Sequence, residues 1–398
     1  MTYIPKRIPK PAGTGGMPPK KSGKSLFSKI NAWLHLWPSI VSGLVVVFVC
    51  LTGTLIVYCD EILEWSAGDA RYVEVGTQRS TSDQLIQSIH DFDPDLQLSE
   101  LVYFNEPNRS IRVRAFHKQT NKLTFLYLDP YTAKVLKADT AAHFFYITAH
   151  LHSALLAGSV GSWVVLVCTV IFFISCVTGL VLWWPKRWTK KTVEDSFTIK
   201  WKARFKRFNY DLHNVYGFYS LLLCFVLSLT GIIIFFHSLG DMITSAFGGV
   251  DEHVEEVLGE YQADRPSVDI SILAYQTLEN HPGKKNAAIW VYTLDEAGVY
   301  VFRLGVAGLK STESQELVVF DRYTGRSMYI PKPQYVHEKV ENVIWQLHMG
   351  QWWGQFGKLS TFLAGVVATS LPITGFLIWW GRRKKKSKKK VPLKATLS

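Results

Sequence analysis

Cysteine is scarce in this chain, and the few cysteines present are not arranged as a metal site or a disulfide framework. Five occur among 398 residues, all within or beside long apolar runs: Cys50, Cys59, Cys168, Cys176 and Cys224. None shows the C-x-x-C spacing of zinc and redox motifs. The long polar segments contain no cysteine, so we expect no disulfide there and interpret all five as small apolar packing residues.

The motifs of common soluble enzymes are also absent. The sequence contains no GxSxG, HExxH, Walker or GxGxxG pattern, so it lacks the usual signatures of hydrolases, zinc proteases, NTPases and dinucleotide-binding enzymes. Its basic segments are too short to hold a nicotinamide or flavin domain. Catalysis of these kinds is therefore a poor explanation of the sequence.

Acidic residues are few at both ends of the chain and in its middle, where lysine and arginine gather. Residues 1–29 and 382–398 contain no Asp or Glu, and residues 185–208 contain two against nine Lys and Arg. Four apolar runs separate these segments from two more acidic ones: Leu36–Tyr58, Val160–Trp184, Val215–Phe236 and Leu359–Trp380. Each run can cross a bilayer, which takes about 20 residues. Because basic loops mark the cytoplasmic side, we predict cytoplasmic termini, a lipid bilayer as partner and no nucleic acid.

The chain also repeats itself. The stretch His150–Trp184 aligns without gaps on Gln346–Trp380, 196 residues later. The segment that begins at His35 aligns on the one that begins at His213, 178 residues later, and both contain the triplet LTG. We therefore predict a duplicated unit of helix, α+β domain and helix, with the two halves related by a pseudo-two-fold axis along the membrane normal.

The predicted fold is a membrane α-helical bundle of four transmembrane helices with two external α+β domains. In each external domain a short helix precedes strands with alternating apolar residues. The predicted order is a basic disordered N-terminus (1–29), helix 1 (30–60), external domain 1 (61–140), helix 2 (141–184), a basic cytoplasmic loop (185–208), helix 3 (209–238), external domain 2 (239–340), helix 4 (341–381) and a basic cytoplasmic tail (382–398).

The repeat arranges four histidines in two equivalent pairs. His35 and His213 are expected near the cytoplasmic ends of their helices, and His152 and His348 near the external ends. A two-fold axis brings each pair face to face, and two facing imidazoles can ligate a six-coordinate haem iron inside a bundle. We predict each pair as the ligands of one haem iron. The alternative is that each histidine is an ordinary interfacial side chain.

The remaining histidines have weaker support. His150 aligns with a glutamine and His237 with a cysteine, so symmetry favours neither, although either could hydrogen-bond a haem propionate or a ligating imidazole. His143 stays unassigned. Five others are interpreted as ordinary surface residues: His90, His117, His253, His281 and His337.

The sequence also predicts a long path between the two pairs. From His152 to Trp184 the chain covers 32 residues, about 48 Å of helix. The pairs are therefore expected about 30 Å or more apart, roughly the thickness of a bilayer core. That distance is long for one direct electron transfer.

These motifs resemble those of the PepSY-associated transmembrane family, which comprises bacterial iron-regulated inner-membrane proteins. The resemblance rests on the paired histidines, both LTG triplets, two Asp-x-Tyr-Thr turns and the stretches TGLVLWW and TGFLIWW, and it covers about residues 30–383. It implies PepSY domains in the external, periplasmic segments and two b-type haems. Some members are similar to ferric-siderophore reductases of the ferrioxamine type. Other members carry a fused flavodoxin-like reductase that is missing here, which leaves a quinol or a separate cytoplasmic reductase as donor.

We therefore predict an inner-membrane ferric-chelate reductase that transfers electrons across the membrane and releases iron in the periplasm. Two alternatives stay open. The chain could be a haem-binding electron-transfer subunit of a partner reductase. It could also be a non-enzymatic PepSY binding or regulatory protein whose histidines are structural.

Overall fold

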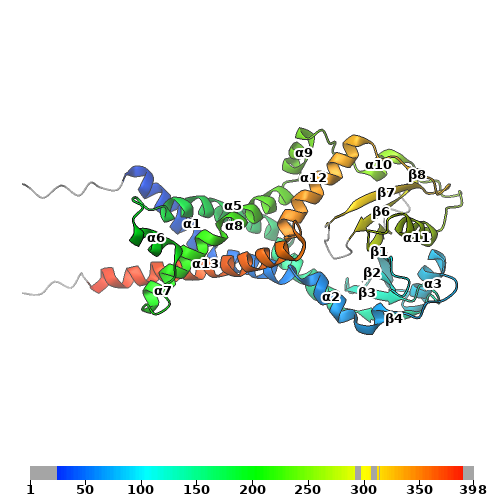
Figure 1. The fold of residues 1–398 in the computed structure, drawn as a ribbon, viewed down its shortest axis with the longest axis horizontal. Helices are drawn as coiled ribbons and strands as arrows, with labels where there is room; N and C mark the ends of the chain where they lie inside the picture. Colours follow the sequence, from blue (N-terminus) through cyan, green and yellow to red (C-terminus); the bar gives the residue numbers. More distant parts are fainter. Residues whose placement is uncertain (1–24, 292–296, 306–311, 313, 389–398) are drawn as a thin grey trace, which may run out of the picture.

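The computed structural model describes residues 25–291, 297–305, 312 and 314–388. The disorder predicted before residue 25 and residues 389–398 of the predicted tail lie outside this part. Helix α1 begins at Leu26, so the last residues of the predicted disordered segment, 1–29, are helical. Figure 1 shows long helices at one end of the molecule and a β-sheet at the other.

Within the described residues, four helical segments are long and apolar enough to cross a membrane. They are Leu26–Ile56 (α1), Gly158–Trp183 (α5), Phe205–Phe235, which contains α7 (Phe205–Asp211) and α8 (Gly217–Phe235), and Gly354–Arg383, the greater part of α13 (Gly354–Lys388). Helices α1 and α8 each pack against both α5 and α13, so they face one another across a diagonal of the bundle. Helix α1 begins and α13 ends away from the sheet (Figure 1).

The second and fourth predicted helices are each broken in two, so the prediction of one continuous helix over 141–184 and over 341–381 is wrong. Helix α4 (Ala141–Ala154) ends before α5, and α12 (Lys332–Met349) ends before α13. The breaks lie at positive φ, which Leu155 and Leu156 adopt in the first and Gly350 and Gly354 in the second. Because each break turns the chain, α4 packs against α1, and α12 packs against α8.

Glycine permits the first of these turns. A Cβ atom on Gly161 would lie 1.8 Å from the carbonyl oxygen of Ala154. Any side chain at this position would therefore push α4 away from α5. The sharp turn depends on the close approach of backbone to backbone.

Shorter helices connect these elements. They are α2 (Cys59–Ala67), a 3-10 turn (Gly68–Arg71), α3 (Ser82–Phe92), α6 (Lys190–Phe197), α9 (His237–Ala246), α10 (Val254–Leu258) and α11 (Ile270–Asn280). Helices α6 and α7 lie at the end of the bundle away from the sheet (Figure 1). This places the basic segment 185–208 beside the start of α1 and the end of α13.

The two predicted α+β domains form one continuous antiparallel sheet of eight strands. Its order is β4-β3-β2-β1-β5-β6-β7-β8. The strands are β1 (Leu96–Phe104), β2 (Ile111–His117), β3 (Leu123–Leu128), β4 (Val135–Asp139), β5 (Asn286–Trp290), β6 (Val299–Gly305), β7 (Glu316–Asp321) and β8 (Ser327–Met328). Strand β1 pairs with β5, with Leu101 opposite Ile289 and Tyr103 opposite Ala287. Each predicted α+β domain thus contributes four strands, and the two are joined through β1 and β5.

One face of the sheet is covered by α3 and α11, which share a single apolar core. This core contains Leu85 and Ile89 of α3 together with Leu273 and Leu278 of α11. Polar contacts also cross between the halves, since Asp269 accepts hydrogen bonds of 2.8 Å from the backbone and side chain of Ser82. The two halves therefore bury their apolar residues against each other.

The other face packs toward the bundle. Cys59 and Leu63 of α2 and Phe145 of α4 cluster with Phe125 of β3. Helix α4 thus contacts the sheet near its beginning and the bundle through its packing on α1. Helix α12 also lies between the bundle and the part of the molecule that holds the sheet (Figure 1).

The shared core predicts that a defect at the β1–β5 pairing spreads to both halves. The substitution Ile289→Ala removes a side chain that is 1% exposed and should lower the free energy of unfolding of the sheet by about 2–5 kcal/mol. Hydrogen exchange should then rise in α3 and α11 together. Leu136→Ala, on the exposed face of β4, is the matched control and should change neither. Faster exchange confined to α11 would show that the halves are independent.

Candidate cofactor site

The structure brings the four predicted histidines together in two pairs. His35 of α1 faces His213, with ring centroids 6.3 Å apart, at the end of the bundle near α6 and α7. We call this the loop-side pair. His152 of α4 faces His348 of α12, with ring centroids 6.0 Å apart, at the other end. We call this the sheet-side pair.

Both separations fit one metal ion held between two imidazoles. An imidazole nitrogen binds a transition metal at about 2.0–2.1 Å, and the ring centroid lies roughly 1.1 Å behind that nitrogen. Ligands on opposite sides of an ion therefore have centroids about 6.3 Å apart. The rings are inclined by 77° in the loop-side pair and 51° in the sheet-side pair. Both angles are compatible with ligation because each ring can rotate about its bond to the metal.

Threonine hydroxyls orient the loop-side pair. His35 Nδ1 lies 3.2 Å from Thr178 Oγ1, and His213 Nδ1 lies 2.9 Å from Thr374 Oγ1. Each hydroxyl already donates its hydrogen to a carbonyl four residues earlier in its own helix. It must therefore accept from the ring, so Nδ1 carries the proton and Nε2 keeps a lone pair. Such a bond on the far nitrogen is typical of metal-ligating histidine.

The sheet-side pair is held in the same tautomer. His152 Nδ1 lies 2.8 Å from the carbonyl oxygen of Val49, which can only accept. His348 Nδ1 lies 3.0 Å from Thr230 Oγ1, whose hydrogen goes to the carbonyl of Val226. Across the described residues, no hydrogen bond involves Nε2 of any of the four histidines. All four therefore have a nitrogen available as a ligand.

A glycine lies beside each of the four histidine rings, and its missing side chain makes room for the ring. A Cβ atom on Gly53 would lie 2.7 Å from Cε1 of His152, and one on Gly231 would lie 3.3 Å from Cε1 of His348. A Cβ atom on Gly179 would lie 3.1 Å from Cε1 of His35, and one on Gly375 would lie 3.2 Å from Cε1 of His213. The four glycines each follow a threonine in the repeated Thr-Gly dipeptides. Three of those threonines contact a histidine directly, so the dipeptide positions the ring.

Sequence reasoning missed these threonines and two buried asparagines. Asn31 Nδ2 donates to the carbonyl of Thr178 at 3.1 Å, and Asn209 Nδ2 donates to that of Thr374 at 3.0 Å. Each asparagine lies four residues before a histidine of the loop-side pair, one helical turn away. The recurrence of Asn-x-x-x-His at the repeat spacing was the available signal.

His213 lies in an irregular part of its helix. Between α7 and α8, residues Leu212–Tyr216 form a π-helical turn. Such turns occur frequently at functional sites because they change the direction of a side chain within a helix.

The structure does not bring the secondary candidates to either pair. His150 is exposed and packs against Tyr146, and His237 is exposed at the start of α9. Neither makes a described contact with the four paired histidines. His143 accepts a hydrogen bond of 3.2 Å from the backbone of Leu123, so it joins α4 to β3.

The two pairs lie toward opposite ends of the bundle. On α1, His35 and Gly53, which touches His152, are 18 residues apart, about 27 Å along the helix. The spacing from His213 to Gly231 on α8 is the same. The layer between the pairs is apolar and includes Cys176, Cys224, Ala368, Phe172 and Phe225. Of the five cysteines, four are buried and Cys50 is partly buried, as expected of packing residues.

A buried charge lies near the sheet-side end of the bundle. Lys358 of α13 donates to Glu61 of α2 at 2.7 Å, and Gln355 donates to the same oxygen at 2.8 Å. Burial disfavours the ionised carboxylate, but these hydrogen bonds outweigh it and hold the pKa of Glu61 below its usual range. The ion pair fixes α2 to the beginning of α13.

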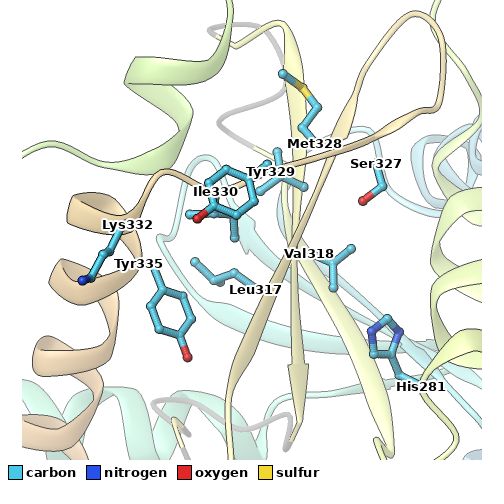
Figure 2. Close-up of a pocket in the computed structure, with 10 residues that line it drawn as sticks. His281, Leu317, Val318, Ser327, Met328, Tyr329, Ile330, Lys332 and Tyr335 are labelled. Carbon is cyan, nitrogen blue, oxygen red and sulfur yellow. The ribbon is translucent and has the colours of Figure 1, made fainter.

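A separate cleft of ≈ 450 Å³ lies at the outer edge of the sheet. Figure 2 shows Leu317, Val318, Met328, Ile330, Lys332, Tyr335 and His281 around it. Tyr335 precedes His348 by 13 residues of α12, about 20 Å. The cleft is therefore not part of either histidine pair.

Gly53 predicts how the sheet-side pair can be removed alone. Gly53→Ala would place a Cβ atom 2.7 Å from Cε1 of His152 and displace the ring. Gly43→Ala is the matched control on the same helix, since its Cβ would lie at 3.5 Å from Pro372. If each pair binds one haem, the first variant should retain about one haem per chain and the second about two, by pyridine haemochrome. Equal haem content in both variants would contradict this geometry.

The chain also matches a known protein family. A family profile described as the PepSY-associated TM region matches residues 32–382, which is most of the chain and contains all four paired histidines. No curated protein matches the chain.

Proposed function

Because the chain belongs to the PepSY-associated TM region family, we propose that it is a membrane oxidoreductase that carries electrons to ferric chelates. The observation that carries this proposal is the pair of histidine sites, with ring separations of 6.3 and 6.0 Å and, among the described residues, hydrogen bonds at Nδ1 and none at Nε2. Two b-type haems, one in each site, would supply one-electron oxidation and reduction. The glycine beside each ring recurs in both halves, since Gly179 and Gly375 lie against His35 and His213, and Gly53 and Gly231 lie against His152 and His348, which supports an internal duplication.

The residues of the bundle have distinct tasks in this proposal. The four imidazoles would ligate the iron, and the threonines, together with the carbonyl of Val49, hold them in the tautomer and orientation that ligation needs. The apolar layer between the sites would exclude water from the path of the electron. Neutral imidazoles on both sides leave the charge of the site to the iron and its macrocycle.

The proposed topology places the basic end of the bundle in the cytoplasm of a bacterial inner membrane. The ends of α1 and α13 and the basic segment with α6 and α7 share that end (Figure 1), in agreement with the positive-inside rule. A quinol or a cytoplasmic reductase would donate electrons at the loop-side pair. The sheet would lie in the periplasm as paired PepSY domains.

Substrate reduction would occur at the sheet side. A chelator that binds hard ferric iron through oxygen atoms holds ferrous iron less tightly, so one electron is enough to favour release. The protein must therefore provide an electron and a docking surface but no tight site for the chelator. This mode of release favours ferric siderophores as the class of substrate.

A difference spectrum tests the cofactor first. The purified full chain, reduced with dithionite, should show low-spin b-type haem at about two per chain. The reduced protein should then release ferrous iron from ferric hydroxamate chelates, measured with a ferrous-specific dye. Haem without release would indicate an electron-transfer subunit of a partner enzyme. Absence of haem after expression with adequate haem supply would leave a binding or regulatory protein and refute the oxidoreductase.

Ligand variants test the assignment of each pair. His152→Ala or His348→Ala should remove about one haem and spare the loop-side site, because the pairs share no ligand. His35→Ala or His213→Ala should do the reverse, and the two classes should differ in redox potential. His150→Ala is the control, since that side chain is exposed and outside both pairs. Loss of both haems from every variant, including the control, would count against separate sites.

A further inference from the structure

A second, smaller cleft lies between the sheet and α4. Its volume is ≈ 280 Å³, and its walls come from the start of β1, the end of β2, the turn after β2 and α4: Gln97, Leu98, Ser99, Phe116, Asn121 and Tyr146. Gln97 and Asn121 are exposed, and the other lining residues are partly buried. The rim of the cleft is therefore open to solvent.

Helix α4 connects this cleft to the sheet-side pair. Tyr146 lines the cleft and precedes His152 by six residues, about 9 Å of helix. On the sheet, the ring of Phe116 packs against Tyr146 with centroids 5.5 Å apart. Along the helix, Tyr146 packs against His150 at 4.4 Å. Aromatic rings therefore extend from the cleft to a residue two positions before His152.

The cleft at the outer edge of the sheet lies farther from its histidine. Tyr335 precedes His348 by 13 residues of α12, about 20 Å. The part of α12 between them is also covered near its start, since His337 is only 7% exposed where the chain around Gly249 packs against it. The interpretation of His337 as a surface residue is therefore wrong. Because electron transfer slows steeply with distance, the smaller cleft is the better placed of the two.

The lining suits an oxygen-rich chelate of low net charge. None of the six lining residues is acidic or basic, and the amides and hydroxyls among them can donate hydrogen bonds to oxygen atoms. Phe116 and Tyr146 add apolar surface, a combination that is common in small-molecule sites. The guanidinium carbon of Arg114 lies 5.5 Å from the centroid of the Phe116 ring and brings a positive charge beside the cleft. Carbonyl and hydroxamate oxygens, which carry partial negative charge, match these groups.

We propose that the ferric chelate docks in this cleft, an inference that rests on the proposed function. One electron leaves the sheet-side site and reduces the ferric iron of the chelate to ferrous iron, and no bond within the chelator is broken. The donor at the loop side replaces that electron. Tyr146 acts as a positioning residue, because it holds the chelate beside the helix that carries His152.

A gallium(III) trihydroxamate tests binding alone, because it resembles the ferric chelate in shape but does not accept an electron. Added to the purified full chain, it should slow hydrogen exchange at the start of β1, in the turn at Asn121 and in α4 near Tyr146. Exchange in β7 and β8, which line the outer-edge cleft, should not change. Protection confined to β7 and β8, or no protection at a saturating concentration, overturns the proposal.

A variant that fills the cleft tests its role in reduction. Gln97→Trp adds bulk from an exposed position, so the chelate concentration that gives half-maximal reoxidation of the reduced protein should rise by about 10-fold or more. Haem content and reoxidation by hexacyanoferrate(III), a small oxidant that needs no cleft, should stay as in wild type. Val318→Trp, in the outer-edge cleft, is the matched control and should react with the chelate as wild type does.

The outcomes separate this inference from the proposed function. If wild type reduces the ferric hydroxamate and Gln97→Trp does so equally well, docking in this cleft is refuted and the proposed function stands. The same holds if only Val318→Trp impairs reduction, which would assign docking to the outer-edge cleft. A wild-type protein that contains haem and reduces no chelate overturns the proposed function and this inference with it.

Discussion

The arrangement of the bundle depends on a hydrogen bond from Nδ1 of each paired histidine to an oxygen on a neighbouring helix. Three of these oxygens belong to threonines whose own hydrogens are already committed to the backbone, and the fourth is a carbonyl. Each histidine can therefore only donate at Nδ1, which determines both its tautomer and the direction of Nε2. The adjoining glycines are required because the rings lie almost against the helix backbone.

This constraint also explains why α4 and α12 are separate from the spanning helices that follow them. A straight helix from residue 141 to 184 would have to carry His152 along the axis of α5. The break at Leu155 and Leu156 instead lets α4 cross onto α1, where His152 reaches the carbonyl of Val49. The same helix begins on the sheet, so the position of the sheet is coupled to the position of a paired histidine.

The histidine pairs and the number of spanning helices could be predicted from the sequence, because both are recorded in repeated patterns. His152 aligns with His348 whatever the tertiary structure. The break at Leu155 could not be predicted in this way, since leucine gives no local signal for positive φ. The β1–β5 pairing joins residues as far apart in the chain as Glu100 and Trp290, and residue patterns within each strand say nothing about such a partner. The burial of His337 likewise depends on how the chain around Gly249 packs on α12.

The continuous sheet has a consequence for biosynthesis. Strand β1 ends at Phe104, and its partner β5 begins at Asn286, after two spanning segments have been made. Until then the first half presents an apolar strand edge with Leu101 and Tyr103 and without its neighbour. Unpaired apolar edges recruit other strands and promote aggregation. Insertion of α5 and α8 into the membrane therefore takes place while the edge of β1 is still unpaired. The protein is most prone to aggregation at this stage of its assembly.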